Sequence, residues 1–193
     1  MKIDIILSGV GGQGILTIAT IIGYAAVETG LYLKQSEVHG MSQRGGDVQS
    51  HLRISDKPIH SDLIPKGKAD IVIAVEPMEG LRYVPFLSPE GWLVSNKTPE
   101  INIPDYPNIE EIYAEIKKLP HYILIDADKI AKDLGNARGM NMVVLGAASP
   151  FLKIDAEKLE NSIRTIFQRK GDKIVEANIK CFRAGQEFSE KNR

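Results

Sequence analysis

The sequence is poor in cysteine, with Cys181 as the single example among 193 residues. One thiol cannot close a disulfide within the chain, and it cannot by itself hold an iron–sulfur cluster or a structural zinc ion. The composition therefore excludes a disulfide scaffold and indicates a reducing compartment such as the cytoplasm. We expect Cys181 to be a small buried side chain of the core.

The sequence also lacks a surplus of either charge and a long apolar run. Its 24 basic and 25 acidic residues give a formal net charge of -1. Nucleic-acid binding normally needs a basic surplus or a basic stripe, so we do not expect it. Asp4, Ser8, Gln13 and a group of glycines interrupt the apolar N-terminal stretch. Because no run reaches the roughly 20 residues that a membrane span needs, we expect neither a membrane span nor a targeting segment.

Short apolar runs alternate with helical patterns over the first two thirds of the chain. Strands are predicted at 2–8, 31–37, 47–55, 69–77, 91–96 and 122–126, and helices at 15–30, 78–87 and 109–119, with a break at Pro85 in the second helix. The remaining segments predict helices only, at 140–152, 155–170 and 172–188. Such alternation is typical of a three-layer α/β/α domain. The run at 47–55 alternates apolar and polar residues, as edge or antiparallel strands do, so we expect a Rossmann-like, mostly parallel but mixed sheet with C-terminal helices in a single domain, 1–193.

Four glycines crowd into the segment GVGGQG, between the first predicted strand and the first predicted helix. Gly9, Gly11, Gly12 and Gly14, together with Gln13, match the G-x-G-x-x-G pattern of dinucleotide-binding loops. Amide hydrogens at the start of a helix bind anions, and glycine lets a phosphate approach the backbone. A dinucleotide also needs an acidic residue about 20 residues further on, near the position of Glu37. Two alternatives stay open: a different phosphate, or glycines that only permit a tight strand-to-helix turn.

A second glycine-rich segment, SEVHGMSQRGGDVQSHLRIS at 36–55, is dense in hydrogen-bonding side chains. The planar guanidinium of Arg44, with glycines on both sides, suits a phosphate or a carboxylate. Polar loops between strands often carry function, although a solvated loop is the plain alternative. The candidate cofactor-binding residues of the two segments are Gly9, Gly11, Gly12, Gln13, Gly14, His39, Ser42, Gln43, Arg44, Gly45 and Gly46.

In this order, the two segments resemble the gamma-type domain of the 2-oxoacid:ferredoxin oxidoreductases, most of all the free-standing chain of the indolepyruvate type. NMVVLGAASPF at 141–151 is similar to the family's Asn-x-x-x-Leu-Gly-Ala segment. NIKCFRAGQE at 178–187 is similar to its Asn-x-x-Ala-Phe-x-x-Gly helix, with Cys181 in place of alanine. The resemblance runs almost from end to end of the chain.

The resemblance implies a reaction that this chain cannot perform alone. The complete enzymes oxidatively decarboxylate a 2-oxoacid with coenzyme A as co-substrate and reduce ferredoxin, using thiamine diphosphate, Mg²⁺ and iron–sulfur clusters. The sequence lacks both the family's thiamine signature, Gly-Asp-Gly followed by Asn, and sets of cluster-binding cysteines. The resemblance therefore implies a subunit that docks onto a larger alpha subunit bearing those cofactors, with ferredoxin acting through the complex. The alternative is an independent protein that binds NAD or another nucleotide.

The remaining polar residues do not form a catalytic or metal-ligating pattern. The histidines at 39, 51, 60 and 121 show no metal-ligand spacing. Asp126 and Asp128 follow a predicted strand, where α/β proteins place ligand groups, but we expect a helix cap there. We assign no catalytic residue and no metal ligand to this chain.

Overall fold

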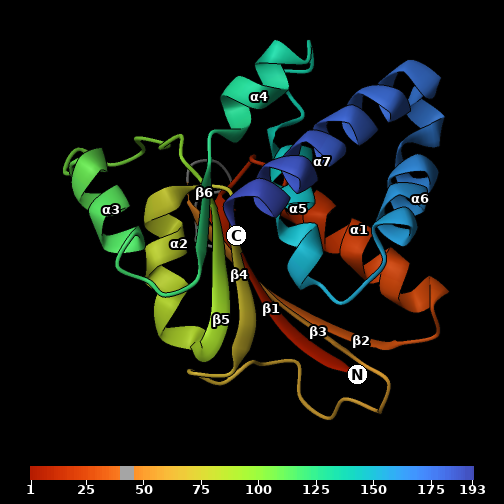
Figure 1. Ribbon diagram of the computed structural model, residues 1–193. Coiled ribbons are helices and arrows are strands. Elements are labelled where there is room, and N and C mark those ends of the chain that lie inside the picture. The colour runs from red at the N-terminus through yellow and green to blue at the C-terminus, as the bar shows by residue number, and fades with distance from the viewer. Residues whose placement is uncertain (40–45) are drawn as a thin grey trace.

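The computed structural model describes residues 1–39 and 46–193 and contains a six-stranded sheet with helices on both faces (Figure 1). The strands lie in the order β2-β3-β1-β4-β5-β6. Their bounds are β1 Lys2–Val10, β2 Tyr32–His39, β3 Asp47–Ser55, β4 Ala69–Ala74, β5 Leu87–Asn96 and β6 Tyr122–Ile125. The helices are α1 Ile15–Glu28, α2 Pro77–Tyr83, α3 Ile109–Ile116, α4 Ala127–Asp133, α5 Met140–Ala148, α6 Ala156–Phe167 and α7 Asp172–Asn192. In the part of the chain that the structure describes, no helix has the length and apolarity needed to cross a membrane.

The sheet is mixed, as the sequence predicts. Strands β1, β4, β5 and β6 are parallel, whereas β3 runs antiparallel to both of its neighbours, β1 and β2. At the end of β1, Val10 is paired with Asp47 at the start of β3. The carboxyl ends of the parallel strands and the start of β3 therefore meet along one side of the sheet, called here the carboxyl edge.

Alternation along β1 divides the core into two layers, as expected for a three-layer fold. Ile3, Ile5 and Leu7 point to the face covered by α1, α5, α6 and α7. Ile6 points to the opposite face, where it packs in the same cluster as Ile112 and the rest of the α3 side. Figure 1 shows α2 and α3 on one side of the sheet and the C-terminal helices on the other.

The C-terminal helices α5 and α7 cross with their backbones in contact. A Cβ atom added to Gly146 would lie 1.8 Å from the carbonyl oxygen of Phe182. One added to Gly185 would lie 1.9 Å from the carbonyl oxygen of Val143. Both distances are far below van der Waals contact, so the crossing requires glycine at both positions. These are the glycines of the two C-terminal segments that carry the family resemblance, and the structure explains them by packing.

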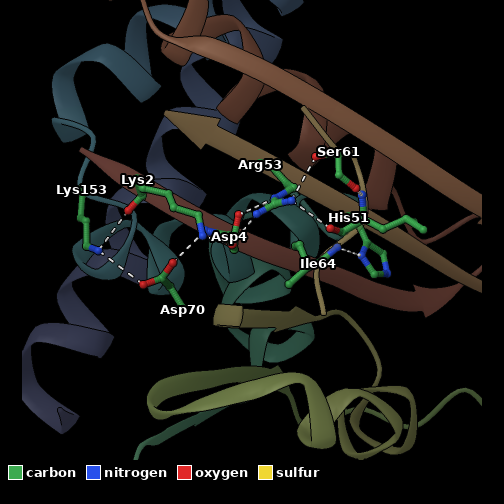
Figure 2. A network of polar contacts seen from close by, with 9 residues as sticks. Lys2, Asp4, His51, Arg53, Ser61, Ile64, Asp70 and Lys153 are labelled. Carbon is green, nitrogen blue, oxygen red and sulfur yellow. Dashed lines mark hydrogen bonds and ion pairs between the residues drawn. The ribbon is translucent and has the colours of Figure 1, made fainter. Parts of the chain in front are cut away.

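A buried ion-pair network secures the opposite side of the sheet, at the amino ends of the parallel strands (Figure 2). The carboxylate of Asp4, 0% exposed, accepts two hydrogen bonds from Arg53, at 2.8 and 3.1 Å, and pairs with Lys2 at 2.8 Å. Arg53 also donates to the carbonyl oxygens of Ser61 and Leu63. The network thus holds the 56–68 segment against the sheet, and its position away from the glycine segments marks it as structural.

Element boundaries differ from the sequence prediction around Pro85. The helix expected at 78–87 begins at Pro77 and ends at Tyr83, a short 3₁₀ turn spans Val84–Phe86, and β5 starts at Leu87 rather than at residue 91. The break expected at Pro85 is confirmed, because proline lacks the amide hydrogen that a continuing helix needs. The last helix, expected at 172–188, extends to Asn192.

Candidate functional site

The two glycine-rich segments meet at the carboxyl edge. The amide of Gly11 donates a hydrogen bond to the carbonyl oxygen of Gly46, over 2.9 Å. The contact follows from the pairing of β1 with β3, which brings the end of one strand to the start of the other. Of the candidate residues, Gly9, Gly11, Gly12, Gln13, Gly14 and Gly46 are therefore gathered in one place.

Two of the glycines are required by close packing. A Cβ atom on Gly9 would lie 2.3 Å from Cγ2 of Val75, and one on Gly14 would lie 2.4 Å from Nδ2 of Asn141. The Asn141 amide also donates to the carbonyl oxygen of Gly14, over 3.4 Å. Contact with Val75 thus explains Gly9, and the positive φ of 84° together with the nearby Asn141 side chain explains Gly14, in both cases without any ligand. The Asn141 contact also joins the C-terminal segment at 141–151 to the first glycine segment.

Gln13 closes the loop on itself. The side-chain oxygen of Gln13 accepts a hydrogen bond from the backbone amide of Val10 over 2.8 Å. The backbone amide of Gln13 donates to the carbonyl oxygen of Val10 over 3.2 Å. The amides of Gly11 and Gln13 are therefore already bonded within the protein. Gly12 differs, because its φ is 103° and a Cβ atom there would meet no atom of the described residues within 4 Å. Within the described part of the chain, the backbone at Gly12 therefore faces open space, and it is the part of the loop that a ligand or partner can approach.

The start of α1 keeps the features of an anion site. Gly14 caps the helix with φ 84°, without a side-chain hydrogen bond, and the first turn contains no acidic residue. The amides of Ile15 and Leu16, at the first helical positions, have no intrahelical acceptor, and the helix dipole places partial positive charge there. This end of α1 can therefore receive a phosphate or carboxylate.

The topology does not favour a dinucleotide at this loop. In dinucleotide-binding sheets, the strand that carries the ribose-binding acid lies directly beside the first strand. Here β3 lies between β1 and β2, the strand that carries Glu37. Glu37 is therefore two strand spacings, or about 10 Å, from β1. Glu37 also accepts a hydrogen bond from Gln35. The acid needed for NAD is therefore not where a Rossmann fold places it.

Residues 40–45 of the second segment lie outside the described residues. The backbone of His39 belongs to β2, where it is paired with Val48. The candidate residues Ser42, Gln43, Arg44 and Gly45 lie between 39 and 46, outside the part of the chain that the structure describes. Their assignment as site residues stays a prediction.

A pocket of about 260 Å³ opens at the carboxyl edge, next to Gly46. It lies against α2 and the 97–108 segment, and its lining consists of Gly46, Asp47, Met78, Glu79, Arg82, Asn102 and Ile103. The Glu79 side chain is 3% exposed, and one of its oxygens lies 3.1 Å from Nε of Arg82, whose side chain is 54% exposed. The pocket therefore contains one partly exposed guanidinium that is already paired with Glu79, beside the carboxylate of Asp47.

The fully buried carboxylate of Glu76 holds together the two segments that line this pocket. Glu76 follows β4 and caps α2, because one of its oxygens accepts from the amide of Glu79 over 2.8 Å. The other oxygen accepts from the hydroxyl of Tyr106 and from the amide of Glu100, the latter over 3.3 Å. Glu76 thereby fastens the 97–108 segment over α2.

Burial dominates the electrostatics of the pocket. It raises the pKa of the Glu79 carboxyl; the Arg82 guanidinium opposes this shift, and the carboxylates of Glu76 and Asp47 add to it. Burial also raises the pKa of Tyr83 to about 12, with Asp47 and Glu79 contributing. Crowded carboxylates thus oppose further negative charge in the interior, and Arg82 provides the compensating cation at the surface.

Glu76, Glu79 and Arg82 are not among the site residues predicted from the sequence. They belong to the stretch VEPMEGLR, directly after the buried strand β4. A signal was present, because polar residues that follow a buried parallel strand lie at the carboxyl edge, where α/β proteins bind ligands. The apolar neighbours and Pro77 drew attention to helix initiation instead.

Three other polar residues have the structural roles expected of them or a close variant. Asp126 caps α4 by accepting from the amide of Lys129 over 3.1 Å, as predicted. Asp128 accepts from the side-chain amide of Asn96 over 2.8 Å. Cys181 is fully buried, and burial raises the pKa of its thiol, so it is an unreactive core side chain, as predicted.

With this geometry established, comparison with known proteins decides the family. Residues 4–188 match the family model described as pyruvate ferredoxin/flavodoxin oxidoreductase. The chain belongs to this family. It is 38% identical over 195 residues to the indolepyruvate oxidoreductase subunit IorB of Archaeoglobus fulgidus, covering 96% of this chain and 94% of that protein.

Solved structures agree with the fold. The gamma subunit of a keto/oxoacid ferredoxin oxidoreductase from Geobacter sulfurreducens is 26% identical, with a TM-score of 0.71 and coverage of 98% of this chain and 99% of that chain. The 2-oxoglutarate:ferredoxin oxidoreductase from Magnetococcus marinus, at 21% identity and a TM-score of 0.80, contains the same fold within a longer chain, because this chain covers 32% of it. The family predicted from the four sequence segments is confirmed.

Proposed function

We propose that this chain is the subunit without thiamine diphosphate of an indolepyruvate, or aryl pyruvate, ferredoxin oxidoreductase of the cytoplasm. The supporting observation is the match to an indolepyruvate oxidoreductase subunit over nearly the full length of both chains. The reaction of the complete enzyme converts the 2-oxoacid and coenzyme A to an acyl thioester and carbon dioxide, and two electrons pass to ferredoxin.

The residues of this chain do not fit an iron–sulfur cluster. Its one cysteine is buried in the α7 packing and receives a weak hydrogen bond from Asn136 over 3.6 Å. Cysteine thiolates hold such clusters in sets of several. We therefore assign the clusters, thiamine diphosphate and Mg²⁺ to a larger alpha subunit, and ferredoxin meets the electrons there.

The carboxyl edge is the side of this chain that we assign to the shared site. It combines the backbone at Gly12 with the start of α1, where Gly14 provides no side-chain cap. Both suit anionic groups, such as the phosphates of coenzyme A or carboxylates of the alpha subunit. In this proposal the chain contributes binding and orientation, and no catalytic residue.

Co-purification tests this assignment. A tagged version of the chain, coexpressed with the thiamine- and cluster-bearing subunit of the same organism, is expected to elute with it and to show the visible absorbance of iron–sulfur clusters. The isolated chain is expected not to bind NAD in a calorimetric titration. A chain that elutes alone and binds NAD would contradict the proposal.

A further inference from the structure

The last strand of the sheet, β6, has a free side. On its other side, β6 is paired with β5. The carbonyl oxygens of His121 and Ile125 accept hydrogen bonds from the amides of Leu93, over 3.1 Å, and Lys97, over 2.8 Å. In a parallel pair, alternate residues of a strand direct both backbone groups to the same neighbour. Tyr122 and Leu124 therefore direct their amide and carbonyl groups away from β5, to a side where the described residues form no further strand.

A groove of about 390 Å³ runs beside this free side. Figure 1 shows β6 next to the C-terminal end of α7, and that end forms one wall. The groove is lined by Trp92, Lys97, Lys117, Pro120, Tyr122, Ile123, Leu124, Phe188, Asn192 and Arg193. Because three successive residues of β6 belong to the lining, the exposed backbone of the strand is itself a wall of the groove.

The charged side chains of the groove all have the same sign. Three of its ten lining residues are cationic, namely Lys97, Lys117 and Arg193, and none is acidic. The nearby Lys118 is paired with Glu115, and Lys191 is paired with Glu187. Within the described residues, Lys117 has no such acidic partner, and the ammonium of Lys97 lies 5.6 Å from the centroid of the Tyr113 ring. The groove therefore attracts a negatively charged occupant.

Two aromatic side chains provide apolar anchoring. Trp92 and Phe188 are partly exposed, and Trp92 is held in place by stacking on Phe151 with a centroid separation of 4.2 Å. Rigid aromatic side chains in a partly enclosed groove are typical centres of binding energy at protein interfaces.

We propose that an extended, acidic segment of the alpha subunit binds in this groove and adds to the sheet beside β6. The inference rests on the proposed function, because it takes the occupant from the partner of that complex. The donors and acceptors of Tyr122 and Leu124 repeat at the two-residue spacing of a strand, and a peptide backbone is the ligand that matches this repeat. A small aromatic carboxylate would satisfy the cations and the rings but leave these backbone groups unused.

Amide hydrogen exchange at single-residue resolution tests the proposal. In the isolated chain, the amides of Tyr122 and Leu124 are expected to exchange much faster than those of Ile123 and Ile125, which face β5. In the complex with the alpha subunit, exchange at Tyr122 and Leu124 is expected to slow at least tenfold, while Ile123 and Ile125 serve as internal references.

A pair of matched charge reversals tests the groove independently. The double variant Lys97→Glu and Lys117→Glu is expected to weaken association with the alpha subunit about tenfold or more, because it opposes an acidic segment. The control, Lys66→Glu with Lys68→Glu, changes the net charge equally on exposed lysines outside the groove and is expected to bind as the unaltered chain does.

The outcomes separate the two proposals. If no complex forms with the unaltered chain, the proposed function fails. If the complex forms but Tyr122 and Leu124 still exchange as in the isolated chain, the docking of a strand at β6 is wrong and the proposed function stands. Protection of both amides by phenylacetate alone would also overturn the docking proposal, because it would make the groove a site for small aromatic anions.

Discussion

The amide nitrogen of Gly11 lies 2.9 Å from the carbonyl oxygen of Gly46 and donates a hydrogen bond to it. This bond makes the two glycine-rich segments of the sequence a single structural unit at the carboxyl edge. It also uses an amide that a phosphate would otherwise bind, which moves the accessible part of the loop to Gly12 and the start of α1. The predictions below test this arrangement and the packing that supports it.

The first prediction compares Gly12→Ala with Gly30→Ala. Both glycines have positive φ, 103° and 76°, and at either position an added Cβ atom would meet none of the atoms that the structure describes within 4 Å. Each substitution is therefore expected to cost about 1–2 kcal/mol from backbone strain alone, measured by urea unfolding of the isolated chain. In the assembled complex, only Gly12→Ala is expected to raise the KM for coenzyme A or to weaken subunit association. Equal effects of both variants on the complex would show that the loop touches neither ligand nor partner.

The second prediction concerns the crossing of α5 and α7. Gly146→Ala places a methyl group 1.8 Å from the Phe182 carbonyl oxygen, so the two helices must move apart. We expect a loss of about 3 kcal/mol or more in unfolding free energy, which corresponds to roughly 6–12 °C in Tm for a protein of this size. The control is Gly23→Ala, where the new methyl group meets only the flexible Leu33 side chain at 3.0 Å. If calorimetry gave the same Tm for both variants, the backbone contact would not be essential.

The third prediction concerns pH. Nδ1 of His51 accepts a hydrogen bond from the amide of Ile64 over 3.0 Å, so His51 is neutral in the folded state. Burial lowers the pKa of His51 from 6.5, while Asp62 raises it and Arg53 lowers it. Below pH 6.5 the unfolded chain binds a proton at His51 that the folded chain does not. The contribution of neutral His51 to the free energy of unfolding is therefore complete above pH 6.5 and is lost as the pH falls.

His51→Gln isolates the effect, because a glutamine oxygen can still accept from Ile64 but does not titrate. Urea unfolding at pH 7.5 and pH 5 is expected to show a smaller loss of stability for His51→Gln than for the unaltered chain. If the loss of unfolding free energy between pH 7.5 and pH 5 were the same in His51→Gln and in the unaltered chain, His51 would not titrate in this range.

The fourth prediction tests Arg44, which the sequence alone assigns as a candidate cofactor-binding residue. Arg44→Ala is expected to remove a charge-assisted hydrogen bond worth about 1.5–3 kcal/mol. This loss weakens binding by roughly 10- to 150-fold. The loss is expected in the KM for coenzyme A if the anion is a phosphate, and in subunit association if it is a carboxylate of the partner. Arg44→Lys is expected to restore only part of it, because a point charge does not replace the planar fork. Unchanged kinetics and sedimentation in Arg44→Ala would make Arg44 a solvated loop residue.

The elements that could be predicted from the sequence are those with a local cause. The isoleucine-rich run of β1 and the one-sided pattern of α3 predict their own structures, and Asp126 predicts its own cap. The position of β3 between β1 and β2 depends on pairing between distant segments, and no local pattern encodes it. The polar residues after β4 indicate where Glu79 and Arg82 lie, at the carboxyl edge, but the pocket itself forms only when the 97–108 segment folds over α2, and no local pattern encodes that contact.

The first residues of β5 illustrate a different limit. Ser88, Pro89, Glu90 and Gly91 show neither apolar alternation nor β-branched side chains, yet they belong to the strand. Gly91 accommodates the close backbone of Ala69, since a Cβ atom there would lie 2.8 Å from the Ala69 carbonyl oxygen. Tertiary packing, and not local propensity, places these residues in the sheet.

An activity measurement on separated and recombined subunits shows whether this chain works only as part of a larger oxidoreductase. The isolated chain, the alpha subunit alone and the reconstituted complex are each given indolepyruvate, coenzyme A and a viologen dye, with pyruvate as a second substrate. We expect no dye reduction by the isolated chain, and reduction by the complex with indolepyruvate preferred over pyruvate. Turnover by the isolated chain, or full activity of the alpha subunit without it, would mean that the chain is not an obligatory subunit of this enzyme.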